Sequence, residues 1–117
     1  MQSSSKLYDL SLIEELLNGN KDSIKKIIEI FVQSTPLTVS AMMEACNAKD
    51  WSRTGKEAHS LKSTIATLKM DSILADIKKI EINSNTATDV EEIPVLVNKV
   101  KSIIDETILQ LKQDFNF

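Results

Sequence analysis

Apolar residues recur at alternating steps of three and four along most of this chain, which is the spacing typical of amphipathic helices. Each of these runs would place its apolar side chains on one face of a helix. The runs consist of Ile24, Ile27, Ile28 and Phe31; Val39, Met42, Met43 and Cys46; Thr54, Ala58, Leu61, Ile65 and Leu68; Ile73, Leu74, Ile77 and Ile80; and Ile93, Val97, Val100, Ile104, Ile108 and Leu111. The pattern predicts helices over most of the chain.

Capping residues and prolines predict where these helices begin and end. Residues 11–19 start with the spacing of a capping box and end in Asn-Gly, which predicts a short helix. Asn20 can cap the next helix. Thr35 and Pro36 resemble a cap followed by proline at the first helical position, which predicts a separate helix ending near Lys49.

The second half of the chain contains one segment with the composition of a loop, residues 83–88, which is rich in Asn, Ser and Thr. Pro94 would remove a hydrogen bond from a helix capped at Asp89, so we expect the last regular helix to begin near Ile93. The segments together predict an all-α fold. We expect residues 1–117 to form a single domain, an antiparallel up-down four-helix bundle with one or two additional short N-terminal helices.

Composition agrees with this fold and excludes several classes of function. Hydrophobic residues make up 42% of the chain and aromatic residues only 4%, which predicts an aliphatic core. The net charge of −3, with no basic cluster longer than a lysine pair, disfavours nucleic-acid binding. No apolar run has the length of a membrane span. The single cysteine, Cys46, cannot form an internal disulfide, which suits a reducing compartment, so we expect a cytoplasmic protein. We also expect a monomer.

The only histidine, His59, lies on the predicted helix over residues 52–68, roughly 145° from the centre of its apolar stripe. The imidazole is therefore predicted to face solvent. Small residues and two lysines share that outward face: Ser52, Gly55, Lys56, Lys62, Ser63 and Ala66. A solvated surface histidine would need no further explanation. The open surroundings instead favour a nucleophilic imidazole that another protein can approach. Gly55 supports this interpretation, because glycine inside a helix costs about 1 kcal/mol relative to alanine, a cost that some other interaction should offset.

The residues around His59 resemble the motif of the histidine phosphotransfer (HPt) domain. That family has alanine-histidine-small-leucine-lysine-glycine, then a leucine-glycine pair and a helix that closes on leucine-glutamate. The matching residues are Ala58-His59-Ser60-Leu61-Lys62, Leu68, Leu74 and Ile80-Glu81, preceded in order by Asp9-Leu10-Ser11, Leu16-Leu17, Gly19, Ile27-Ile28-Glu29-Ile30-Phe31, Thr35-Pro36-Leu37, Ala45, Ala48 and Asp50-Trp51. The resemblance extends from about Leu7 to Glu81.

This resemblance implies a phosphorelay function in two-component signal transduction. His59 would be the phosphoacceptor, exchanging a phosphoryl group with an aspartate of a response-regulator receiver domain, which supplies the magnesium ion. Lys56 and Lys62, one turn either side of His59, could neutralise phosphate oxygens. The chain itself would need no cofactor and no metal, and it has no glycine-rich phosphate loop for nucleotide-dependent kinase activity. A hybrid histidine kinase is a further expected partner, and the surface expected to dock the receiver comprises Gly55, Lys56, Ser63 and Ala66.

Two residues depart from the family pattern. Ser63 replaces the usual glycine four residues after the histidine, and it is still small enough to leave the face open. Lys69 replaces a second glycine near the end of the helix. A lysine there would either take the left-handed conformation at a cost of about 1 kcal/mol or end the helix differently.

Other classes of protein fit these residues less well. A histidine-kinase dimerisation domain normally has an acidic residue after its histidine, where this chain has Ser60. A zinc or di-iron bundle needs several converging ligands, and one outward histidine cannot provide them. A hydrolase triad would need an acid near His59, which only a distant helix could supply. The remaining alternative is a protein-interaction bundle, HPt-like in fold but without phosphotransfer.

Overall fold

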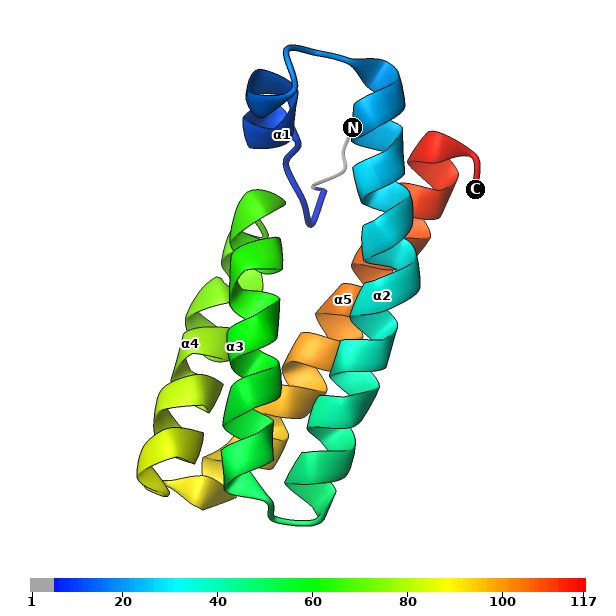
Figure 1. Ribbon diagram of the computed structural model, residues 1–117. Helices are drawn as coiled ribbons and strands as arrows, with labels where there is room; N and C mark the ends of the chain where they lie inside the picture. The colour runs from blue at the N-terminus through cyan, green and yellow to red at the C-terminus, as the bar shows by residue number, and fades with distance from the viewer. Residues whose placement is uncertain (1–5) are drawn as a thin grey trace.

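A computed structural model describes residues 6–117, and this part of the chain is helical with no β-strand (Figure 1). The helices are α1 (Ser11–Leu16), α2 (Lys21–Asn47), α3 (Trp51–Thr67), α4 (Asp71–Thr86) and α5 (Ile93–Phe115), and a short 3₁₀ turn, η1 (Val90–Glu92), precedes α5. The all-α prediction is confirmed, and so is the start of the last helix at Ile93. None of the helices in residues 6–117 combines the length and the apolar character needed to cross a membrane.

The four long helices run alternately up and down (Figure 1). α3 packs against α2 and α4, and α5 packs against the same two helices from the opposite corner of the bundle. This arrangement is the predicted antiparallel up-down four-helix bundle. α1 is the additional short N-terminal helix, and it covers the end of the bundle where α3 ends and α4 begins, with Ile13 buried.

The core between the helices is almost entirely aliphatic, as the composition predicts. Phe31 is the one buried aromatic side chain in residues 6–117. The fully buried large side chains include Ile28 and Met42 of α2, Ile65 of α3, Ile77 of α4 and Ile104 of α5. Burying side chains of this size contributes about 1.5–3 kcal/mol each, so the bundle is held mainly by this continuous apolar interior.

The predicted break at Pro36 is wrong, because α2 continues through it as a single helix of 27 residues. A proline inside a helix removes one hydrogen bond and costs about 3 kcal/mol. The buried positions on either side nevertheless form one uninterrupted stripe, which packs against α3 and α5 along the helix: Ile24, Ile28, Phe31, Thr35, Val39, Met42, Ala45 and Cys46. Burial of this stripe outweighs the local penalty, so the two predicted segments merge.

The predicted loop over residues 83–88 is also mostly wrong, because α4 extends to Thr86. Asn83 and Ser84 are buried in its last turns rather than exposed in a loop. The chain then reverses through Ala87 and Asp89, which both have left-handed backbone conformations, with φ of 51° and 47°. Packing against α3 keeps this polar segment helical in spite of its composition.

The N-terminal segment ties the end of α5 to the end of α3. The Lys6 ammonium and the Tyr8 hydroxyl both bond the carboxylate of Asp114. One residue further on, the Asp9 amide donates to the carbonyl oxygen of Leu68, 2.9 Å away. These contacts hold α1 over the bundle end.

α3 ends in the left-handed conformation that the family pattern assigns to glycine. Lys69 has φ of 49°, and its amide donates to the Ala66 carbonyl at 3.1 Å. The Met70 amide donates to the Ile65 carbonyl at 3.0 Å, which completes a Schellman motif. Of the two outcomes expected for a lysine here, the helix therefore keeps the left-handed end.

Lys69→Gly should raise the free energy of unfolding by about 1 kcal/mol, because glycine adopts positive φ without the steric cost of a Cβ atom. Urea denaturation followed by circular dichroism measures this. Lys69→Ala is the matched control, since it removes the same side chain but keeps Cβ, and its stability should lie within about 0.5 kcal/mol of the original protein. Equal stability of the glycine and alanine variants would show that the conformation carries no strain.

Candidate functional site

α3 presents His59 to solvent near the middle of its length. Asp50 caps the helix by accepting a hydrogen bond from the Arg53 amide at 3.2 Å. The face opposite His59 is buried in the core through Thr54, Ala58, Leu61 and Ile65. The His59 side chain is 67% exposed. The outward orientation predicted from helical periodicity is therefore confirmed.

The carboxylate of Glu81, on α4, contacts both His59 and Lys62. His59 Nδ1 lies 2.6 Å from Glu81 Oε2, and Lys62 Nζ donates to Glu81 Oε1 at 2.9 Å. The Glu81 side chain is only 16% exposed, so both interactions lie in the junction between the two helices. The family motif includes this glutamate, but the periodicity of α3 alone could not reveal that it reaches the imidazole.

This network assigns the proton of the neutral imidazole. The hydrogen bonds from Lys62 and then from His59 hold the pKa of Glu81 below the usual range of a glutamate. An ionised carboxylate can only accept hydrogen bonds, so Nδ1 of His59 is the donor. The neutral ring then has its lone pair on Nε2, which no residue in 6–117 engages through a hydrogen bond. Glu81 therefore fixes the tautomer in which Nε2 carries the free lone pair.

A shallow hollow surrounds the imidazole at the junction of α3 and α4. α3 contributes mainly small side chains beside His59 and Lys62, and α4 contributes Leu74 and Lys78 at the opposite wall. The α3 side chains that complete the lining are Ser60, Ser63 and Ala66. Ser63 and Ala66 are exposed next to His59, where the sequence placed them. Lys78 was not predicted, because its position depends on how α4 lies against α3.

Gly55 does not belong to this open surface, so the prediction that it faces outward beside His59 is wrong. It is buried against α4: a Cβ atom at Gly55 would lie 2.6 Å from Asn85 Oδ1 and 3.3 Å from the Ser84 Cβ atom. The sequence placed this residue outside because helical periodicity puts it on the same face as His59, and that pattern does not show which helix covers the face. The longer α4 covers Gly55, and the missing side chain lets the two helices approach closely.

Lys56, the other lysine predicted beside His59, is exposed one turn before it. Its side chain does not line the hollow around the imidazole. Its carbonyl oxygen accepts a hydrogen bond from the Ser60 hydroxyl at 3.2 Å, which is a contact internal to α3. The structure therefore brings Lys62 to the His59 site and leaves Lys56 outside it.

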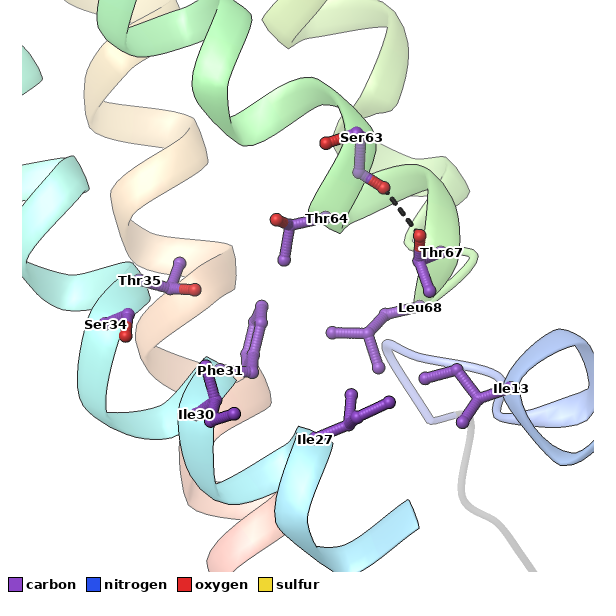
Figure 2. A pocket seen from close by; sticks show the side chains of 10 residues that line it. All are labelled: Ile13, Ile27, Ile30, Phe31, Ser34, Thr35, Ser63, Thr64, Thr67 and Leu68. Carbon is purple, nitrogen blue, oxygen red and sulfur yellow. Dashed lines mark hydrogen bonds between the residues drawn. The ribbon is translucent and has the colours of Figure 1, made fainter. Parts of the chain in front are cut away.

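A second, more apolar groove lies between α2 and α3 and shares Ser63 with the hollow around His59. Figure 2 shows its side chains, with Phe31 and Ile27 of α2 across from Thr64 and Leu68 at the end of α3. Its lining consists of Ile13, Ile27, Ile30, Phe31, Ser34, Thr35, Ser63, Thr64, Thr67 and Leu68. Ile30 is 55% exposed and Ile27 is 37% exposed. An open apolar groove thus adjoins the face that carries the imidazole.

Comparison of the chain with protein-family models, with curated proteins and with solved structures gives no match. Within residues 6–117, no three His, Cys, Asp or Glu side chains cluster in a way that could hold a metal ion. The function must therefore be inferred from the chemistry of the α3–α4 junction and from the motif around His59.

Glu81→Ala should move the proton of the neutral His59 ring from Nδ1 to Nε2, because the acceptor that holds it on Nδ1 is lost. Long-range ¹⁵N–¹H correlation spectra at mildly alkaline pH distinguish the two tautomers. Glu57→Ala is the matched control, because Glu57 lies on α3 close to His59 but pairs with Arg53 instead. An unchanged tautomer in Glu81→Ala would contradict the assigned role of this carboxylate.

Proposed function

We propose that this protein is a phosphorelay intermediate, which accepts a phosphoryl group on His59 from an aspartyl phosphate of a receiver domain and passes it on to a receiver aspartate. The observation that carries the proposal is the exposed imidazole whose Nδ1 is held by Glu81, so that Nε2 keeps its lone pair. The resemblance of residues 58–62 to the HPt motif supports the same function.

The transfer needs no proton to enter or leave the site. The bond between phosphorus and the aspartyl oxygen breaks as the bond between phosphorus and Nε2 forms, and the aspartate leaves as a carboxylate with the electron pair. The imidazole then carries a positive charge, while its Nδ1 proton stays hydrogen-bonded to Glu81. The carboxylate compensates that charge through a charge-assisted hydrogen bond. The reverse transfer retraces these steps.

Transfers of this kind pass through a loose, in-line transition state, in which catalysis consists mostly of positioning and charge stabilisation. The receiver would supply the aspartate and the magnesium ion. This chain would supply an oriented nucleophile, with Lys62 fixing the Glu81 carboxylate at 2.9 Å. Nothing in this role requires turnover by the chain alone, and we therefore propose a phosphocarrier rather than an enzyme.

The receiver must come close enough to His59 for its aspartyl phosphate to reach Nε2. The small side chains of Ser60, Ser63 and Ala66 leave room for this approach. Ser63 also borders the apolar groove between α2 and α3, so one partner surface could cover both features. We therefore place the receiver over the hollow at His59, with its apolar contact on Ile27 and Ile30.

His59→Gln should abolish phosphotransfer and leave stability within about 0.5 kcal/mol, because the side chain is exposed and lies off the packed stripe. Lys62→Ala should slow transfer without abolishing it, since the nucleophile remains. The measurement uses a panel of receiver domains charged with acetyl phosphate, followed by intact-mass analysis of the chain. The phosphoryl linkage should be labile in acid and stable in alkali, as expected for phosphorus bonded to nitrogen.

Phosphorylation of the His59→Gln variant by a receiver would exclude His59 as the acceptor. If the original chain binds receivers but none transfers a phosphoryl group to it, the protein is an interaction bundle without phosphotransfer.

Ile30→Glu and Ser63→Arg should each weaken receiver binding by about tenfold or more, because a charge or a bulky side chain would intrude on the contact. Both side chains are exposed, so the thermal unfolding temperature should barely change. Leu109→Glu is the matched control, since Leu109 is 61% exposed on α5, the helix at the opposite corner from α3. Calorimetric titration with a receiver that transfers to His59 measures the affinities. Loss of binding only in the α5 variant would place the partner on the other side of the bundle.

A further inference from the structure

Lys78 of α4 faces the same hollow as His59 and Lys62 of α3. The pairing of the two antiparallel helices accounts for this position. Gly55 of α3 lies against Asn85 of α4. His59 is one turn after Gly55 on α3, and it contacts Glu81, which is one turn before Asn85 on α4. The next turn in each direction brings Lys78 level with residues 62–63. The helix packing that positions Glu81 therefore also puts Lys78 at the edge of the hollow that contains the imidazole.

Two lysines line the hollow around His59, and Lys78 is the one whose charge no carboxylate compensates within residues 6–117. Lys62 Nζ is bound by Glu81 at 2.9 Å, so its charge is largely compensated by that carboxylate. The next lysine of α4, Lys79, pairs with Glu92 at 3.6 Å. Among residues 6–117, Lys78 forms neither an ion pair nor a side-chain hydrogen bond. Its ammonium can therefore bind an anion that enters the hollow.

We infer that Lys78 binds the phosphoryl oxygens of phosphorylated His59, an inference that rests on the proposed relay function. A phosphoryl group on Nε2 would bring up to two negative charges into the hollow. The lysine presents three donors at the end of a flexible four-carbon chain, so it can follow the phosphoryl group during transfer. Lys62, one of the two lysines that the sequence predicts for this contact, would instead act mainly by fixing Glu81.

The experiment uses phosphoramidate, a small phosphoryl donor that modifies accessible histidine nitrogens without any receiver. A neighbouring ammonium favours the dianionic phosphoryl group and lowers its pKa. Lys78→Gln should therefore raise the pKa of the phosphoryl group on His59 by about half a pH unit, measured from its ³¹P shift during titration. Transfer from a charged receiver should slow by about fivefold, and Lys78→Arg should restore both values.

Lys79→Gln is the matched control, because it removes the same charge from the neighbouring residue of the same helix, at a side chain that pairs with Glu92. It should leave the phosphoryl pKa and the transfer rate unchanged. Equal shifts in Lys78→Gln and Lys79→Gln, or no shift in Lys78→Gln, would overturn the role of Lys78 while leaving the relay intact. If the phosphoryl pKa shifts in Lys78→Gln but no receiver transfers a phosphoryl group to the chain, the result would support phosphoryl binding by Lys78 and overturn the relay function. Failure of phosphoramidate to label His59 would overturn both, because both require Nε2 to be open to phosphate.

Discussion

Glu81 binds two side chains of α3 at once, His59 at 2.6 Å and Lys62 at 2.9 Å, and this requires that α3 and α4 lie in one particular register. Gly55, one turn before His59, lies against Asn85, one turn after Glu81. A side chain at Gly55 would press on α4 at this point. Gly55 therefore affects the site from one turn before His59, because it lets the two helices come close enough for the Glu81 carboxylate to reach the imidazole. Its conformational cost inside α3 is offset by this close packing.

Keeping α4 helical over its last turns has a cost of its own. The Asn83 Nδ2 and Ser84 Oγ atoms are buried and make no hydrogen bond within residues 6–117. Each buried polar atom without a partner costs about 1–3 kcal/mol. A loop over these residues would expose both atoms to water, but it would also remove the turn of α4 that packs on Gly55. The bundle thus tolerates two buried polar groups without partners in the last turns of α4. Glu81 lies on the turn of α4 just before them.

Helical periodicity predicts the helices of this fold well, because each apolar stripe is defined by residues close together in the chain. It fails where long-range packing decides the outcome, at Pro36 inside α2 and at residues 83–86 of α4. The same limit applies to the site. His59, Ser63 and Ala66 were placed correctly from the geometry of α3 alone. Three other features depend on the register between α3 and α4, which no pattern within one helix can specify. They are the position of Lys78 on the hollow, the contact between Glu81 and the imidazole, and the burial of Gly55.

The two departures from the family pattern affect this surface differently. Ser63 stands where the hollow at His59 meets the groove of α2 and α3, and its side chain, only one hydroxymethyl group larger than glycine, leaves both open. Lys69 keeps the left-handed end of α3, with φ of 49°, although its Cβ atom is unfavourable there. Its cost is local, since the Schellman hydrogen bonds at Ala66 and Ile65 are still made. Because α3 ends in this left-handed turn, α4 begins at Asp71 and runs back along α3 in the register on which the His59 site depends.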